Sequence, residues 1–505
     1  MHVNLIIALV SGITFVAYFI VAWRLRNSFT SVEDYFNYSR QMPENLFSDT
    51  FLATNVTFAS IYLVITATTF ERGNLTLWIL IAWIVGLLLF RKLFPRATNF
   101  LEKGHTLHEF LGNTYQSDML RKLASICTII VFTGTLGIEF WGVMMILNGL
   151  GLTNSLTRGF VAIFIALVTS LYTMLGGFKA AVHTDHLQKY LILIMGFLLA
   201  LLSFGAFGSL AGFSGAQRIN ILNDLFNLKN LFSDPLFSIS IFIMFVPFNF
   251  CVMDMWQRCT ATTKLVRNSA IKSVGSLKTM LTFAFAFGVP IIVGLAARQV
   301  SPKLSPASGM SILPNFISSL SVESALQIGV NALIYAGFFA ALASTADTLL
   351  INISYTFVYD ILAPCRNIDF STITAKQKEH TIAIFKFWVF FFGLLAVPLI
   401  FCGLTLYQLV FAVFSSQIVL FIPILYGLLK PEYAAGRANG AMISVIAGFA
   451  IAILSVVIGF FFENTDLINA TPILAFGVST MIFFIIPKSN RNYNLIQGNL
   501  TEGEL

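Results

Sequence analysis

Long apolar stretches alternate with short polar loops along almost the whole of this 505-residue chain. An α-helix needs about 20 apolar residues to cross a hydrocarbon core of about 30 Å, and each stretch is long enough to do so. We expect about thirteen transmembrane helices, at 3–24, 46–70, 75–94, 121–151, 156–175, 182–212, 236–258, 274–298, 324–361, 378–402, 405–429, 438–463 and 469–487. The pattern therefore predicts an all-α integral membrane protein.

Polar residues and helix breakers interrupt two of the expected helices at mid-membrane depth. The helix 46–70 contains the run ATNVTFAS at 53–60, and the helix 236–258, five spans later, contains FVPFN at 245–249. Proline removes a backbone donor, and Asn, Thr and Ser offer the backbone other hydrogen bonds. Transporters built from inverted repeats bind substrate where matching helices are broken. The alternative is two ordinary helices whose polar side chains bond to neighbouring helices.

Composition agrees with a membrane protein and excludes other classes. The chain is 57% hydrophobic and 10% charged, whereas soluble domains have about 25% charged residues. The net charge of +7 comes from Lys and Arg in short loops, so we expect no nucleic-acid binding. The five cysteines are scattered and predict neither disulfides nor a metal site. The first apolar segment lacks a basic start and a cleavage site, so we expect a retained helix.

The basic loops predict the orientation of the chain in the membrane. Lys and Arg gather in the loops 91–122 and 258–278, which the positive-inside rule places in the cytoplasm. This puts the N-terminus outside and, with an odd number of spans, the tail 488–505 in the cytoplasm. We expect a multi-pass protein of the cell membrane, inner or plasma.

Three further runs carry a recognisable motif pattern: GGFKAAVHTDHLQ at 176–188, ALASTADTLL at 341–350 and DMWQR at 254–258. They resemble, respectively, the Gly-Gly-x-x-Ala-Val-x-x-Thr-Asp-x-x-Gln signature, the sodium-site helix and the Gln-Arg helix end of the sodium:solute symporter family. Members of that family carry sugars, proline, pantothenate, sialic acid and carboxylates. Matches at these spacings extend from about Ser39 to about Gly448, so the resemblance covers most of the chain.

The resemblance implies a single transporter domain over 1–505. Its centre would be a five-plus-five inverted-repeat, LeuT-like core at 46–430, preceded by one helix at 3–24 and followed by two at 438–487. The implied function is sodium-coupled symport of a small polar organic solute by alternating access, without enzymatic chemistry. Sodium would be the coupling ion, with no organic cofactor. The partners would be the solute, sodium and the lipid bilayer, with no obligate protein partner evident.

Other functions stay open at this point. Proton coupling could use the buried acidic residues, and some relatives carry a cytoplasmic kinase on a similar core, so a membrane sensor is an alternative. The short tail argues against a sensor with its own catalytic domain. An integral-membrane enzyme would need a nucleophile or metal set in a sealed cavity, and the sequence offers none.

The resemblance also implies a principal sodium site. Carried over by position, the site would use the backbone carbonyls of Ala53, Val56 and Ala341 and the hydroxyls of Ser344 and Thr345. A dehydrated hard cation prefers oxygen ligands, and a broken helix leaves carbonyls without their usual partners. The alternative is that these hydroxyls bond back to carbonyls of their own helix.

A second cation site is predicted from Asp185, Asp347 and Thr348. In relatives with a second sodium the matching positions supply hydroxyls and one carboxylate, whereas this chain offers two carboxylates. Two carboxylates in one dry site cannot both stay charged without a cation, so either sodium or a proton would join them; we favour sodium. The alternative is that Asp347 merely caps or pairs near the cytoplasmic side.

The solute is expected at the broken helices and at one buried acid. The substrate-binding candidates are Asn55, Thr57, Ser60, Glu139, Phe248 and Asn249. A lone carboxylate such as Glu139 in the helix 121–151 costs about 2.5–3.5 kcal/mol on insertion scales unless it is paired or hydrated. We expect Glu139 to face the central cavity and to bind a cationic or hydrogen-donating group of the solute. The alternative is that Glu139 is a structural partner of a polar neighbour.

Overall fold

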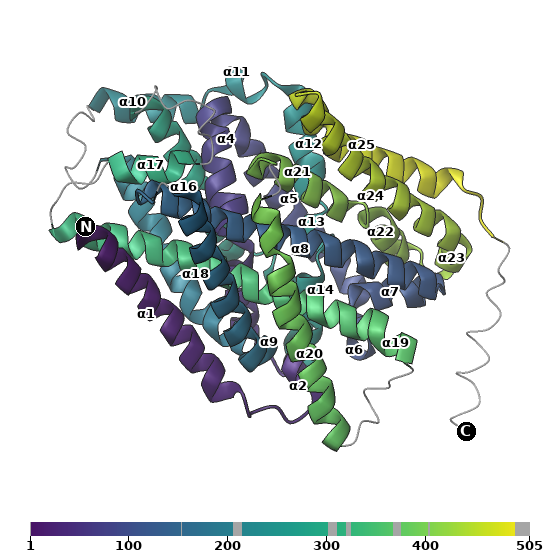
Figure 1. Cartoon of the computed structure of the whole chain (residues 1–505). Helices are drawn as coiled ribbons and strands as arrows, with labels where there is room; N and C mark the ends of the chain where they lie inside the picture. Colours follow the sequence, from purple (N-terminus) through teal and green to yellow (C-terminus); the bar gives the residue numbers. More distant parts are fainter. Residues whose placement is uncertain are drawn as a thin grey trace.

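The computed structural model describes residues 2–152, 154–205, 215–300, 311–319, 325–366, 375–401 and 404–489. Within these ranges every regular element is a helix, and the one β-type contact is an isolated bridge between Met42 and Thr262. Figure 1 shows long helices packed side by side, with α1 along one edge of the molecule and the pair α24 and α25 along another. The predicted all-α fold is confirmed.

The first part of the chain forms α1 (His2–Leu25), α2 (Val32–Asn37), η1 (Tyr38–Arg40), α3 (Glu44–Asn55), the π-helical η2 (Phe58–Leu63), α4 (Val64–Arg72), η3 (Gly73–Thr76), α5 (Leu77–Leu93), η4 (Phe94–Ala97), α6 (Thr98–Lys103), α7 (Leu107–Tyr115), α8 (Asp118–Gly149) and α9 (Ser155–Ser203). The middle forms α10 (Gly215–Leu225), α11 (Leu228–Leu231), α12 (Pro235–Phe245), α13 (Phe248–Cys251), α14 (Met253–Ala261), α15 (Lys264–Ser273) and α16 (Leu277–Val300).

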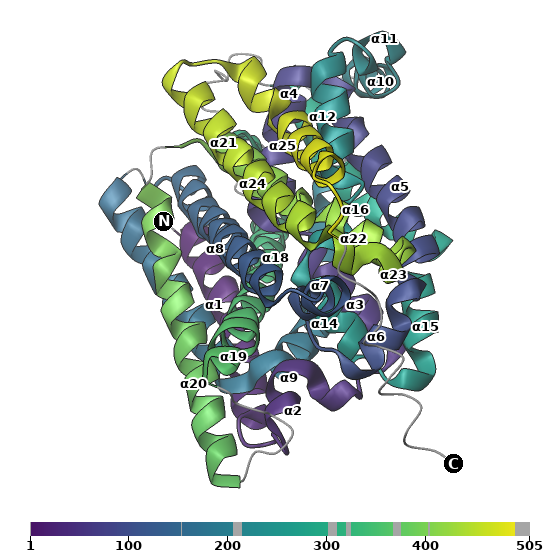
Figure 2. The same ribbon diagram turned by 90° about the vertical axis from the view of Figure 1, so that its right-hand side faces the viewer.

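The last part forms α17 (Ile312–Ser319), α18 (Ala325–Tyr355), the π-helical η6 (Thr356–Leu362), α19 (Ala363–Arg366), α20 (Ala375–Leu395), η7 (Val397–Phe401), α21 (Leu406–Ile418), α22 (Phe421–Leu429), α23 (Pro431–Ala434), η8 (Ala435–Arg437), α24 (Ala438–Phe461) and α25 (Thr465–Ile485). In Figure 2, α20 lies on one side and α5 on the other, with α8 and α18 between them.

The number of membrane-crossing helices differs from the expected thirteen. Among the described residues, ten helical stretches are long and apolar enough to cross a bilayer. Phe58–Lys103 and Ser155–Ser203 are each continuous through two expected spans, and α1 contributes only the shorter apolar segment Leu9–Leu25. The count of thirteen is therefore not confirmed, although helices lie at all thirteen expected places. The chain is a multi-pass membrane protein.

A glycine kink divides α9 within the signature run. Gly177 has φ +56, in the left-handed region that glycine adopts at little cost. A β-carbon at this position would lie 2.5 Å from the backbone oxygen of Tyr35 in α2. Glycine is therefore required both for the bend and for the close approach of α2. The bend directs the second half of α9, which carries Asp185, against α3 and α18.

Both predicted helix breaks are confirmed. The first helix stops at Asn55 and resumes at Phe58, with Val56 and Thr57 outside helical geometry. The second stops at Phe245, and a further interruption follows at Val252, which is extended. Two interrupted helices thus meet in the interior of the molecule.

Candidate functional site

A small cavity lies where the two interrupted helices meet. Its volume is about 60 Å³, and its walls come from α3, η2, α5, α8, α12, α13, α14, α18 and α21. The predicted solute residues Asn55, Thr57, Ser60 and Phe248 line it, whereas Glu139 and Asn249 do not. One water takes about 30 Å³ of liquid volume, so the cavity holds about two waters. A larger solute requires its walls to move apart.

Several of the residues that line the cavity were missed by the sequence analysis. Trp83 of α5, Phe132 of α8 and Gln417 of α21 line the same space. Trp83 Nε1 and Gln417 Oε1 are buried without a hydrogen-bond partner in the described part of the chain, while Gln417 Nε2 donates to the carbonyl oxygen of Cys251. Gln417 had a readable signal, because an amide within a transmembrane helix needs a partner. Trp83 and Phe132 had no such signal in the sequence, because aromatic residues are frequent throughout the apolar stretches.

Glu139 holds the start of the resumed helix. Its carboxylate accepts hydrogen bonds from the backbone nitrogens of Ala59 (3.0 Å) and Ser60 (3.3 Å) and from Ser60 Oγ (3.2 Å). A helix start exposes unpaired N–H groups and carries partial positive charge, so a carboxylate stabilises it. Glu139 is fully buried behind the break. Glu139 thus has the polar neighbours that the structural alternative requires, and it does not itself line the cavity, although its partner Ser60 does.

Asn249 is placed differently from its predicted role as well. Its side chain is fully buried on α13, and both amide atoms lack a hydrogen-bond partner in the described part of the chain. Because Asn249 does not line the cavity, the structure brings only four of the six solute candidates together.

The five predicted principal sodium residues lie buried where α18 passes the break in α3. Thr345 Oγ1 donates to the carbonyl oxygens of Thr54 (3.2 Å) and Ala341 (3.0 Å). Ala53, Val56 and Ser344 are fully buried. The group therefore offers neutral oxygens, close to carbonyls of the broken helix and away from water. This donor set fits a dehydrated sodium ion.

Asp185 is the carboxylate nearest to this group. Its Oδ1 accepts a hydrogen bond from Ser344 Oγ, and its Oδ2 accepts one from Thr50 Oγ1. The neighbouring histidine of the signature, His186, contacts Asp49 at 2.5 Å, and Asp49 is also paired with Lys189 at 2.5 Å. Asp185 is therefore surrounded by hydroxyl groups on one side of α18, and the Asp49 charge is balanced by its own partners.

A buried arginine lies one hydroxyl group away from Asp185, through Thr50. Arg258 is fully buried, and its Nη1 is paired with Asp254 Oδ2 at 2.6 Å. The same guanidinium donates to the hydroxyls of Thr54, Thr50 (3.2 Å) and Thr348 (3.3 Å). The Thr348 hydroxyl therefore faces Arg258 and Thr54, and no hydrogen bond joins this hydroxyl to Asp347 among the described residues.

Asp347 is fully buried and has only neutral partners. Its Oδ2 accepts hydrogen bonds from Tyr172 Oη (3.1 Å) and Thr184 Oγ1 (3.4 Å), and its Oδ1 has no partner among the described residues. Asp347 and Asp185 lie within electrostatic range of each other. The two carboxylates of the predicted second site are thus together, without a cationic side chain bonded to either of them.

The charges of this buried region do not balance. Asp185, Asp254 and Asp347 supply three carboxylates, and Arg258 supplies the one buried guanidinium bonded within the cluster that the structure describes. Subtracting one positive from three negative charges leaves an excess of two negative charges. Burying an unpaired charge is costly, so the cluster needs two positive charges from outside it, as cations, as protons or as one of each.

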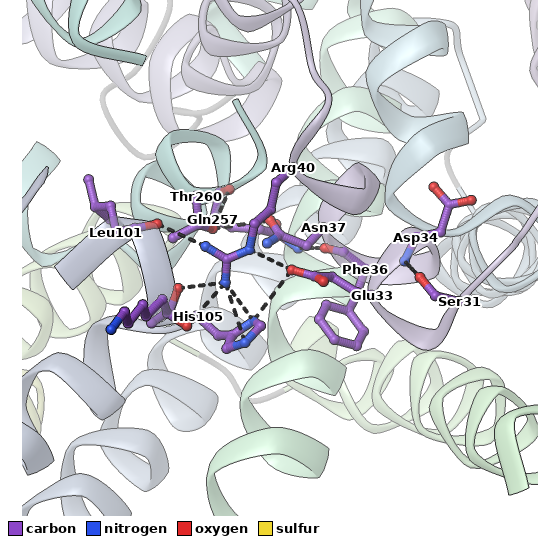
Figure 3. Close-up of polar contacts among 12 residues, drawn as sticks. Ser31, Glu33, Asp34, Phe36, Asn37, Arg40, Leu101, His105, Gln257 and Thr260 are labelled. Carbon is purple, nitrogen blue, oxygen red and sulfur yellow. Dashed lines mark hydrogen bonds and ion pairs between the residues drawn. The ribbon is translucent and has the colours of Figure 1, made fainter. Parts of the chain in front are cut away.

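A second polar network closes the face that we expect to be cytoplasmic. Figure 3 shows Arg40 reaching from η1 to Glu33 and to the end of α6. Arg40 Nε is paired with Glu33 Oε1 at 2.6 Å, and its Nη atoms donate to the carbonyl oxygens of Leu101 (2.8 Å) and Gly104 (3.0 Å). These are carbonyls at a helix C-terminus, where a cation is stabilising. These hydrogen bonds join the segment before α3 to the end of α6.

The backbone at this fastening is strained. Tyr38, Ser39 and Arg40 all have positive φ, at 53°, 47° and 56°. Left-handed helical geometry costs about 1–2 kcal/mol per residue for L-amino acids. The several hydrogen bonds of Arg40 offset that cost.

Comparison with known proteins agrees with this architecture. A family model described as the sodium:solute symporter family matches residues 35–448. The chain is 23% identical over 426 residues to sodium/glucose cotransporter 1 of Mus musculus, covering 75% of this chain and 61% of that relative. It is 25% identical over 400 residues to the sodium/pantothenate symporter of Haemophilus influenzae, covering 76% and 75% of the two chains.

Among solved structures, the chain is similar to a Na⁺-coupled sialic acid symporter in a substrate-bound, outward-open state. The TM-score is 0.71 at 20% sequence identity, over 96% of this chain and 99% of that one. This likeness shows that the fold is LeuT-like. The chain spans less than two thirds of the mouse glucose cotransporter and half or less of the mouse myo-inositol cotransporter 2 that it also matches. With a family match that runs through 35–448, the chain belongs to the sodium:solute symporter family.

Proposed function

We propose that this chain couples inward sodium flow to the uptake of a small polar organic solute by alternating access. Sodium is the coupling ion, and no organic cofactor takes part. The protein acts in the cell membrane with its N-terminus outside and its C-terminal tail in the cytoplasm. It catalyses no covalent reaction.

The observation that carries the proposal is the charge excess beside the broken helix. Asp185 and Asp347 share a dry region in which Arg258 is already paired with Asp254. Cations that enter from the outside would relieve the unpaired charge, because like charges in one buried site cannot both persist alone. Ion binding would thus stabilise one packing of α3, α9 and α18, which is how binding shifts a conformational equilibrium.

The two cations would occupy different chemical settings. The neutral oxygens around Ser344 and Thr345 form the principal sodium site together with the carbonyls of Ala53, Val56 and Ala341. The second cation lies with Asp185 and Asp347, and Thr348 is outside this site because it faces Arg258. The Ser344 hydroxyl, bonded to Asp185, connects the two settings.

The solute would bind in the cavity at the breaks. Its polar lining is mostly hydroxyls and amides, as in Thr57, Ser60 and Gln417, and its one charged residue, Asp254, is paired with Arg258. Aromatic faces such as Trp83 complete the walls. This lining suits a solute with several hydrogen-bonding groups, in agreement with relatives named for glucose, myo-inositol and pantothenate.

Proton coupling is the second candidate function. It is supported by Asp347 Oδ1, which has no hydrogen-bond partner among the described residues and is therefore free to carry a proton. A proton shared by Asp185 and Asp347 would relieve the same repulsion as a sodium ion. The two candidates differ in what drives transport. Sodium coupling requires sodium at every pH, whereas proton coupling requires a pH gradient and works in sodium-free buffer.

Sodium-dependent thermal stabilisation of the purified protein tests the proposal without knowledge of the solute. Melting is recorded as NaCl replaces choline chloride at constant ionic strength, with KCl as a second comparison. We expect sodium alone to raise the midpoint. The double variant Ser344→Ala, Thr345→Ala should need about thirtyfold more sodium, since each of the two lost buried ligands costs about 1 kcal/mol.

The matched control is Ser354→Ala. Ser354 is buried on the same helix and its hydroxyl has no partner in the described part of the chain, so its removal changes neither ion site. An equal response of the protein to sodium, potassium and choline would contradict sodium coupling. An equal sodium response of the control and the double variant would remove the principal site from α18.

A further inference from the structure

We infer that α1, the helix outside the five-plus-five core, completes the second cation site: Tyr18 Oη and Gln188 Oε1 bind a sodium ion together with the free Oδ1 of Asp347. The inference rests on the proposed function and names two ligands of the second cation. It adds residues that neither the motif pattern nor the predicted site includes. It also gives α1 a role in ion binding.

The first observation is a set of buried polar atoms without partners. Tyr18 Oη, both amide atoms of Gln188 and Asp347 Oδ1 make no hydrogen bond in the part of the chain that the structure describes. Tyr18 is 1% exposed, and Gln188 and Asp347 are 0% exposed. Nearly all buried polar groups in native proteins are satisfied. Four unsatisfied atoms on three neighbouring side chains therefore indicate a missing ligand.

The second observation is that the three side chains are neighbours. The Tyr18 hydroxyl lies beside the Thr14 and Gln188 side chains and within electrostatic range of Asp347 and Asp185. Gln188 follows Thr184 by one helical turn, so both project from the same face of α9. Thr184 Oγ1 contacts Asp347 Oδ2 at 3.4 Å. The face of α9 that carries Gln188 is thus the face that meets Asp347.

The ring of Tyr18 is held in place by its neighbours. It contacts the Phe15 ring at 6.0 Å and the Tyr172 ring at 6.3 Å between centroids. Tyr172 Oη donates to Asp347 Oδ2 and to the carbonyl oxygen of Ala343 (3.2 Å). Tyr172 therefore occupies one carboxylate oxygen of Asp347 as a donor, and Tyr18, whose ring contacts Tyr172, keeps a hydroxyl without a partner among the described residues. These ring contacts fix the position of the Tyr18 hydroxyl and form no hydrogen bond with it.

The chemistry of the free atoms selects a small hard cation. They comprise a carboxylate oxygen, a phenol oxygen and an amide oxygen, which are the oxygen types that hard cations prefer. Hydroxyl groups already satisfy both oxygens of Asp185, so the open coordination lies on the Asp347 side. The amide oxygen can be a ligand while the Gln188 nitrogen donates to a neighbouring oxygen.

Tyr18→Phe tests the inference with the smallest change. It removes only the hydroxyl and keeps the ring contacts with Phe15 and Tyr172. Sodium binding to the full-length purified protein is measured by thermal shift and by calorimetry, with sodium alone as the probe. We expect a Hill coefficient near two in the parent protein, falling toward one in the variant, with about tenfold weaker binding of one ion.

Tyr62→Phe is the matched control. The Tyr62 hydroxyl is also buried without a partner among the described residues. Unlike Tyr18, it has no carboxylate within the described ranges near enough to interact with it electrostatically. Gln188→Leu should repeat the effect of Tyr18→Phe. If Gln188→Leu fails to fold, Gln188→Met is used in its place, because the methionine side chain adapts its shape to the space.

Three results would overturn the inference. If Tyr18→Phe and Tyr62→Phe bind sodium alike while Ser344→Ala, Thr345→Ala binds it weakly, α1 has no part in the site and the proposed function stands. If Tyr18→Phe lowers the melting midpoint equally in sodium and potassium, the atoms hold an ordered water only. If the variant changes the pH dependence and leaves sodium binding intact, the site holds a proton. A parent protein without any sodium response would contradict the proposed function itself.

Discussion

Two aspartates on one continuous helical run show how differently this protein treats a buried charge. Asp347 in α18 and Asp360 in η6 are both fully buried. Asp360 Oδ1 accepts from Arg121 Nε (2.8 Å) and Thr106 Oγ1 (2.8 Å), and its Oδ2 contacts His108 Nδ1 at 3.0 Å. Asp347 has neutral donors on Oδ2, and its Oδ1 has no hydrogen-bond partner among the residues that the structure describes.

The difference separates a structural carboxylate from a candidate ion ligand. Asp360 carries its counter-charge within the protein, so its environment is complete at all times. Asp347 must obtain a positive charge from outside the chain. Burial and residue type are identical at the two positions, and only the partners distinguish them. Mutations at the two positions should therefore affect different properties.

The largest expected effect is on stability at Asp360. Asp360→Asn leaves the Arg121 guanidinium facing a neutral amide, and breaking a buried ion pair costs about 3–5 kcal/mol. We expect the melting midpoint in detergent to fall sharply and equally in sodium and potassium buffers. An unchanged midpoint would show that the Asp360 cluster contributes no stability and would remove the basis of the comparison.

The matching change at Asp347 should act on ion binding. Asp347→Asn removes a charge that has no partner in the protein, so the midpoint in potassium should hold or rise. The sodium response should lose its second ion, with a Hill coefficient that drops from about two to about one, because one buried site then lacks its carboxylate. Sodium titration followed by thermal shift measures both. A large loss of stability in potassium would make Asp347 structural like Asp360.

Glu139 is an intermediate case between Asp347 and Asp360. Its partners are helix N–H groups and one hydroxyl, so it resembles Asp360 in being fully hydrogen-bonded. In Glu139→Gln the amide nitrogen faces backbone donors, and an unsatisfied buried donor costs about 1–3 kcal/mol. We expect moderate destabilisation with an unchanged sodium midpoint. Full stability combined with lost solute binding would return Glu139 to the role predicted from the sequence.

The smallest effect is expected from His105, in the loop between α6 and α7. Burial and the Arg40 guanidinium lower the pKa of His105 from 6.5 to about 4, against the opposing effect of Glu33. The unfolded chain therefore binds a proton at a higher pH than the folded protein. Stability from this residue is complete above pH 6.5 and is lost as the pH falls toward 4.

His105→Gln should flatten that part of the pH profile. Melting midpoints recorded from pH 7.5 to about pH 4 provide the measurement. Besides Arg40 and Glu33, the charges of Asp360 and Arg121 act on the imidazole, so Asp360→Asn is kept out of the comparison. An identical slope in the parent protein and the variant would place the pH dependence elsewhere.

The sequence predicted local features well. The breaks at 56–57 and near Pro247 follow from residues at the breaks themselves, because proline and short polar side chains alter the backbone that carries them. The sequence also pointed to Ser344, Thr345 and Asp185, whose side chains the structure brings to one buried region. Each of these is a property of one short run.

Features that depend on packing between distant helices were not predictable. Thr348 faces Arg258 because of how α14 crosses α18, and a helical period alone cannot specify the neighbour. Glu139 reaches Ala59 and Ser60 only because α8 passes behind the break. Tyr18 had no signal, since a tyrosine in an apolar helix reads as an ordinary packing residue. The count of thirteen spans stays unconfirmed, because Phe58–Lys103 and Ser155–Ser203 each run through two of the expected spans.

Equilibrium binding of radioactive sodium to the purified protein tests the central claim most directly. Binding is measured at constant ionic strength, with choline as the replacing cation, for the parent protein and for Asp347→Asn. The excess of two buried negative charges predicts saturable binding of about two sodium ions per chain in the parent and about one in the variant. Absence of saturable sodium binding, or identical binding by the two proteins, would contradict the account.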